Sequence, residues 1–117
     1  MKELRCLVFT DREVVDAILD RRRRLKESLP PGEVKRIRFT LEGGVRTTLS
    51  IENEGTVEEL QLTEQEVQAA LISHCMAKGV PLPVEADKAL YLIRGNATLM
   101  ITLNFRKPAR LVAQGAA

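Results

Sequence analysis

Two kinds of hydrophobic periodicity occur along the chain, and both appear in each half. Alternating apolar and polar positions, typical of strands buried on one face, mark six segments at about 3–9, 34–41, 45–52, 57–62, 87–94 and 97–104. Apolar positions at helical spacing mark two longer segments at about 11–27 and 64–78. The pattern therefore predicts the order strand, helix, strand, strand, followed by the same order again.

The two predicted helices begin with the same motif. Thr10 and Glu13, and later Thr63 and Glu66, have the spacing of a capping box. In this motif the threonine hydroxyl accepts a hydrogen bond from an amide of the first helical turn, and the glutamate carboxylate accepts one from the threonine amide. We therefore expect the helices to start at residues 11 and 64.

Turn-forming residues separate the predicted strands. Glu42-Gly43-Gly44 and Gly95-Asn96 each lie between two alternating segments and indicate hairpins. Asn53-Glu54-Gly55 lies midway along the chain, and we interpret it as the join between the two halves.

The halves resemble each other in sequence. The two capping boxes lie 53 positions apart, and the same offset aligns Ala17 with Ala70 inside the helices. For the last strand of each half we assign an offset of 52, which aligns Leu49 with Ile101. A match that extends over helix, loop and strand predicts an internal duplication.

Either half alone is too small to bury a core, so we expect one domain over residues 1–107, made of two βαββ units at about 3–52 and 57–105. Residues 108–117 are expected to form a flexible tail. The predicted fold class is α+β: a two-layer sandwich in which the tandem repeat gives a six-stranded, mostly antiparallel sheet with two helices on one face. This order of elements resembles, in fold only, small-molecule-binding domains of the gyrase-inhibitory-protein type and some protein-interaction domains. No motif residue extends the resemblance to a function.

The face of the sheet that the helices leave open is partly apolar. Apolar or thiol side chains are expected there at Leu4, Cys6, Val8, Ala89, Tyr91, Ile93 and Met100. Such a patch needs a cover, and we expect a second copy of the chain, which makes the protein a homodimeric interaction module. The alternatives are a partner protein, a small ligand bound beside Tyr91, Met100, Cys6 and His74 in a sensor domain, or cover by the tail or by a curled sheet.

Charge suggests a second hypothesis. The 18 Lys and Arg nearly balance the 16 Asp and Glu, leaving a formal charge of +2. Basic residues nevertheless cluster at Arg21, Arg22, Arg23, Arg24 and Lys26 on the first helix, at Arg36, Arg38 and Arg46 on the strands, and at Arg106, Lys107 and Arg110 near the end. They suggest a nucleic-acid or other anionic partner. We favour this less, because consecutive arginines point around a helix, and because Phe9 and Phe39 are expected in the core and provide no platform for base stacking.

No catalytic constellation is evident. The single histidine and two cysteines are too few for a zinc site, no glycine-rich phosphate loop occurs, and we expect neither a metal nor a cofactor. Cys6 and His74 are expected on opposite faces of the sheet, which excludes a Cys–His nucleophile pair. No apolar stretch is long enough for a membrane span, and charged residues occupy the start of the chain where a signal peptide is apolar. We therefore expect a cytoplasmic protein that is not an enzyme.

Overall fold

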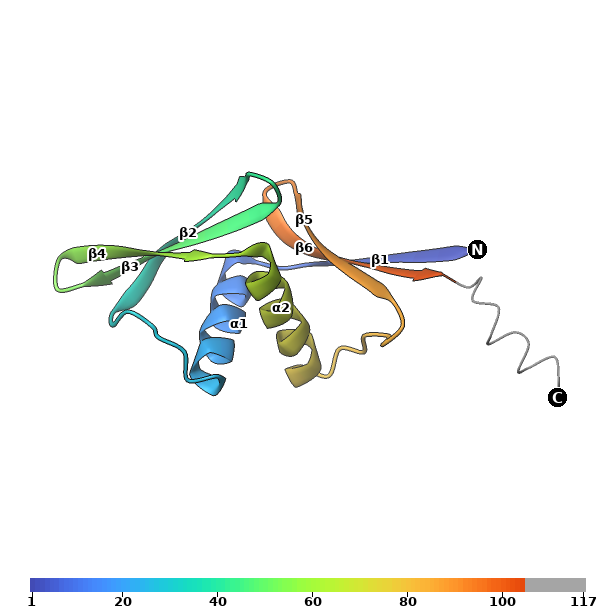
Figure 1. Cartoon of the computed structure of the whole chain (residues 1–117), viewed down its shortest axis with the longest axis horizontal. Coiled ribbons are helices and arrows are strands. Elements are labelled where there is room, and N and C mark those ends of the chain that lie inside the picture. Colours follow the sequence, from blue (N-terminus) through green and yellow to red (C-terminus); the bar gives the residue numbers. More distant parts are fainter. Residues whose placement is uncertain (105–117) are drawn as a thin grey trace.

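A computed structural model describes residues 1–104 of the chain (Figure 1). Its elements are β1 (Lys2–Val8), α1 (Asp11–Arg24), β2 (Glu33–Leu41), β3 (Val45–Asn53), β4 (Thr56–Leu62), α2 (Glu64–Ala77), β5 (Asp87–Ile93) and β6 (Asn96–Asn104). All strand pairs are antiparallel. The predicted α+β class and the predicted order of elements are confirmed.

Both helices start where the sequence predicts, but only the first has a complete capping box. The Thr10 hydroxyl accepts the Glu13 amide at 3.1 Å, and the Glu13 carboxylate accepts the Thr10 amide at 2.9 Å. At α2 the Thr63 hydroxyl accepts the Glu66 amide at 3.2 Å. The Glu66 carboxylate instead binds Arg22 of α1, so a contact between the helices replaces half of the expected box.

The six strands form two three-stranded sheets, with orders β1-β6-β5 and β2-β3-β4, rather than the single six-stranded sheet that we expected. The reason is the turn at Glu54-Gly55, where both residues have positive φ angles of 51° and 83°. Such a two-residue turn joins adjacent antiparallel strands, so β4 continues directly from β3 into the same sheet. We had interpreted this segment as the join between units. Each sheet thus takes one strand from the other half of the chain.

The pairing register relates positions in the two sheets. Inward-facing rows of paired residues are Ile37–Leu49–Leu60 in one sheet and Leu90–Leu99–Leu7 in the other. Leu49 therefore occupies the place of Leu99, which corrects the alignment of Leu49 with Ile101. The β5–β6 ladder ends one pair earlier than the β2–β3 ladder, and its loop is one residue shorter. Together these differences reduce the offset from 53 to 50. Duplication itself stays a prediction.

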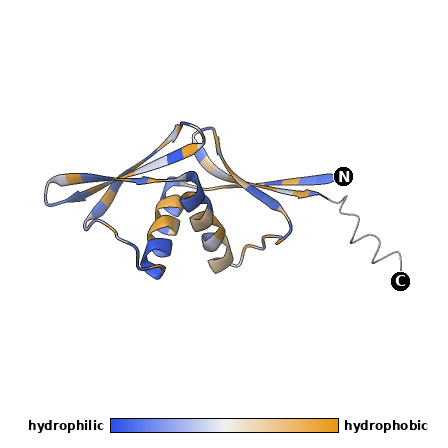
Figure 2. Ribbon diagram, in the orientation of Figure 1, coloured by the Kyte–Doolittle hydropathy of each residue, from blue (hydrophilic) through white to orange (hydrophobic). Residues whose placement is uncertain are grey.

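The core lies between the helix pair and the two sheets, which spread to either side above the helices in Figure 1. Figure 2 shows hydrophobic residues on both helices and, alternating with hydrophilic ones, along the strands. The largest fully buried side chains are Ile18, Leu49, Leu71, Leu99, Ile101, Val14 and Val67. Two leucines near the ends of elements are exposed, although helical spacing and alternation place them with the core residues. Leu25 is 50% exposed because α1 has ended at Arg24, and Leu41 is 70% exposed at the last position of β2.

Candidate functional site

The seven residues predicted for the open apolar face gather on one surface. The register aligns Val8, Thr98 and Tyr91 in one row across the sheet and Cys6, Met100 and Ala89 in the next. Leu4 and Ile93 extend the same face in its two directions. Side-chain exposure is highest at the edges of this surface, 64% for Leu4, 57% for Val8, 49% for Tyr91 and 36% for Ile93. We call these seven residues the apolar face: Leu4, Cys6, Val8, Ala89, Tyr91, Ile93 and Met100.

Nothing in residues 1–104 covers the apolar face, because both helices pack against the opposite side of the sheets. Thr98 is the polar residue at its centre, and it is fully buried between its neighbours in the row. Its hydroxyl donates to the Asn96 carbonyl oxygen at 3.1 Å and so presents no free polar group. The surface is therefore apolar throughout its middle.

The other sheet provides an internal comparison. The outer positions that correspond by register to Cys6, Val8, Ala89, Tyr91 and Met100 are Glu59, Gln61, Arg36, Arg38 and Ser50. These five positions are thus polar in the other sheet, whereas Leu4 corresponds to Val57, which is also apolar and 58% exposed. Since the same architecture accommodates a polar outer face, folding does not require the apolar one.

The basic cluster of α1 is not a single binding surface, because Arg22 is committed to an internal contact. Its Nε lies 2.7 Å from Oε2 of Glu66 and its second nitrogen 3.0 Å from Oε1, while the third donates to the Ser28 carbonyl oxygen at 2.7 Å. The Arg22 and Glu66 side chains are only 12% and 17% exposed. Hydrogen bonding to Glu66 raises the pKa of Arg22. The structure therefore makes Arg22 a helix-to-helix clamp rather than the anion ligand that we predicted.

The other residues of this cluster lie around the hydrophilic C-terminal end of α1, which is visible in Figure 2. Arg23 forms an exposed pair with Asp20 at 3.2 Å, instead of the pair of Asp20 with Arg24 suggested by the helical spacing. Arg21 is half-buried, Arg24 is exposed, and Lys26 follows the helix end with a positive φ of 54°. Their charges consequently point in several directions.

The strand arginines Arg36, Arg38 and Arg46 do share the outer face of the sheet β2-β3-β4, as predicted. Acidic side chains lie on the same face, and Arg38 is 3.5 Å from Glu59. The charge of this surface is mixed rather than uniformly basic.

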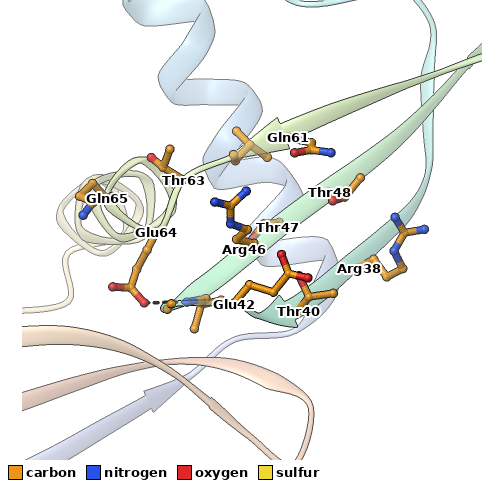
Figure 3. Close-up of a pocket in the computed structure, with 14 residues that line it drawn as sticks. Arg38, Thr40, Glu42, Arg46, Thr47, Thr48, Gln61, Thr63, Glu64 and Gln65 are labelled. Atoms are coloured by element: carbon orange, nitrogen blue, oxygen red, sulfur yellow. Dashed lines mark hydrogen bonds between the residues drawn. The ribbon is translucent and has the colours of Figure 1, made fainter.

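A polar hollow of about 450 Å³ lies at one end of this face (Figure 3), and we did not predict it from the sequence. Its labelled side chains are Arg38, Thr40, Glu42, Arg46, Thr47, Thr48, Gln61, Thr63, Glu64 and Gln65. Beyond the last residue of β4, an Oε1 atom of Glu64 accepts the Val45 amide at 2.8 Å and takes the place of a strand partner. The hollow arises where β4 gives way to α2. No sequence motif marks such a place.

A second, smaller hollow of about 240 Å³ lies beside the edge strand β1, and Cys6, His74 and Cys75 all line it. Cys6 and His74 lie on opposite sides of the sheet, as expected, and both border the hollow because β1 is an outer strand. The His74 ring makes an edge contact with Phe9 at 6.4 Å between centroids. Burial, followed by the nearby Glu13 carboxylate, raises the pKa of the Cys75 thiol, which disfavours the reactive thiolate.

In the part of the chain that the structure describes, no three His, Cys, Asp or Glu side chains are grouped to hold a metal ion. Within the same residues neither helix has the length and apolar character needed to cross a membrane. Arg106, Lys107, Arg110 and the predicted tail at 108–117 lie outside the described residues. Comparisons with protein-family models, curated proteins and solved structures find no match. Function is therefore argued from the surfaces alone.

Proposed function

We propose that this protein is a non-enzymatic, cytoplasmic interaction module that forms a homodimer through the apolar face. The observation that carries the proposal is the contrast between the two outer faces, one apolar and one polar at corresponding positions. An exposed cluster of large apolar side chains that the fold does not require is typical of an interaction surface.

The charges at the two ends of β5 favour a second copy as the occupant. Asp87 lies at one end of the strand and Arg94 follows the other end, and both are exposed. A two-fold axis that lies in the interface and runs perpendicular to β5 reverses the direction of this strand in the partner, so that Asp87 of each copy approaches Arg94 of the other. The surface is thus complementary to itself in charge as well as apolar at its centre.

The size of the face sets the expected strength of association. A face three strands wide and seven residues long measures roughly 14 Å by 23 Å. Two such faces bury less area than the ~1,600 Å² of a standard interface, so we expect a dimer that dissociates in the micromolar range.

The test is the mass of the particle in solution, measured by native mass spectrometry and sedimentation at micromolar concentration. We expect the wild-type chain to dimerise, and Tyr91→Glu or Ile93→Glu to give soluble monomers, because each introduces a charge into the apolar contact. Gln61→Glu is the matched control, since it introduces the same charge at an outer position of the other sheet. A wild-type protein that stays monomeric well above the micromolar range contradicts the proposal, as does a Tyr91→Glu variant that still dimerises.

The alternative of a nucleic-acid or other anionic partner has less support. Arg22 is engaged with Glu66, and the strand arginines share their face with glutamates. A binder of this kind would have an affinity that falls steeply with salt. We expect no such binding to DNA or RNA oligonucleotides at low ionic strength.

A further inference from the structure

The polar hollow of Figure 3 holds two opposite charges that are not used within the described structure. The Arg46 guanidinium and the Glu42 carboxylate both line it. Within residues 1–104 neither side chain forms a hydrogen bond or ion pair, and the two are not paired with each other. Arg38, the other cation of the hollow, already has Glu59 as a neighbour at 3.5 Å. The hollow therefore presents one available cation and one available anion.

The lining between these charges is rich in hydrogen-bonding groups. Thr40 pairs with Arg46 across the β2–β3 ladder, and Thr48 lies between Arg38 and Gln61 in the next outer row. Thr47 alternates with Arg46 and Thr48 along β3 and so faces the inner side of the sheet, where its hydroxyl is buried without a partner among the described residues. Its hydroxyl is therefore not part of the polar lining.

We propose that this hollow binds a small zwitterion of the amino-acid type, with its carboxylate on Arg46 and its ammonium group on Glu42. A guanidinium offers a carboxylate two parallel hydrogen bonds, and a carboxylate is the natural partner of an ammonium ion. A volume of about 450 Å³ is within the range of small-molecule sites and accommodates a free amino acid. A simple anion satisfies Arg46 but brings negative charge towards Glu42 and Glu64. The zwitterion therefore fits the charges better.

The experiment is a titration of the isotope-labelled full chain, followed by amide NMR shifts. The probes are the proteinogenic L-amino acids, added one at a time at millimolar concentration. We expect at least one to shift the amide signals of residues 46–48 saturably. The matching carboxylic acid without the amine, and the matching amine without the carboxylate, are expected to leave these signals in place. If no amino acid shifts them, or if the acid alone binds equally well, the proposal is wrong.

Variants locate the site on the surface. Arg46→Gln and Glu42→Gln should each weaken binding by about tenfold or more, because each removes one of the charge-assisted contacts. Arg36→Gln is the matched control, since Arg36 lies on the same face outside the hollow, and it should bind as the wild type does. Equal losses in Arg36→Gln and Arg46→Gln would show non-specific charge attraction instead. The site lies on the sheet opposite to the apolar face, so these results are independent of whether the chain dimerises.

Discussion

Replacing Arg22 by alanine is expected to destabilise the protein more than any other substitution in the basic cluster. Its guanidinium makes two hydrogen bonds to Glu66 and one to the Ser28 carbonyl oxygen, all between 2.7 and 3.0 Å. Arg22→Ala leaves the Glu66 carboxylate at the helix contact with only 17% of its side chain exposed and no counter-charge. Losing the partner of a fully buried charge costs about 3–5 kcal/mol, and the remaining exposure reduces this to about 2–4 kcal/mol.

The free energy of unfolding can be measured by urea denaturation followed by far-ultraviolet circular dichroism, since the chain has no tryptophan for fluorescence. A double-mutant cycle with Glu66→Ala isolates the pair: the double variant should cost clearly less than the sum of the two single variants. Arg23→Ala is the control, because its pair with Asp20 is 63% exposed on both sides and should contribute about 1 kcal/mol or less. If Arg22→Ala destabilises no more than Arg23→Ala, or if the cycle is additive, Arg22 is not the clamp described here.

Three further predictions concern single positions. Gly32→Ala should destabilise by about 1–3 kcal/mol in urea unfolding, because Gly32 has a φ of 125° and a Cβ there would lie 2.3 Å from the Glu52 carbonyl oxygen; Gly43→Ala, with open space around it, should cost less. Hydrogen bonds from the N-cap lower the pKa of Glu13 in the folded protein. Its contribution to stability is therefore complete above its pKa in the unfolded chain, and it is lost as the pH falls through the lower folded-state pKa. Glu13→Gln should flatten this part of an acid titration of stability, and an unchanged acid profile would contradict the assignment. Thr47→Val should raise the stability of the ligand-free protein by about 1 kcal/mol, since it removes an unpartnered buried hydroxyl, and a lower melting temperature would show that the hydroxyl has a partner.

The elements could be predicted from the sequence because they depend on local patterns. Helix starts at Thr10 and Thr63 follow from short-range hydrogen bonding, and the strands follow from alternation, so their ends differ from the predicted ones by only one or two residues. The C-terminus of α1 was placed three residues too late because the fraying turn after Arg24 still contains helix-forming residues.

Strand partners could not be predicted in the same way. Alternation states which face a side chain occupies, but it does not state which strand lies beside it. The local signal was present at Glu54-Gly55, where a two-residue turn requires β3 and β4 to be neighbours, and it was interpreted as a connection between units. With β4 in that sheet, β1 pairs with β6 instead. This pairing joins the two ends of the described chain, so it cannot be predicted from a local sequence pattern.

The candidate sites also differ in how far local sequence patterns predict them. Alternation predicts that each residue of the apolar face lies on an outer side of a sheet, but these residues gather on one surface only because β1 pairs with β6. The polar hollow depends on Glu64 binding the Val45 amide beyond the end of β4, which is a tertiary contact without a spacing rule. Arg22 shows the reverse case, in which a clear charge motif is used internally because α2 presents Glu66 to it.

The correspondence between the two halves gives the strongest argument about function. With the helix offset of 53, Arg22 corresponds to Cys75 and Glu66 to Glu13, so the clamp on one side of the helix pair is replaced on the other by a buried thiol and a completed capping box. The inner faces of the sheets carry similar apolar residues at corresponding positions, whereas the outer faces differ in kind at Cys6, Val8, Ala89, Tyr91 and Met100 and their counterparts. Packing against the helices accounts for the similarity, since it makes the same demand on both inner faces. Nothing in the fold distinguishes one outer face from the other, and the proposed partner surface on one sheet and the proposed polar ligand on the other would account for their difference.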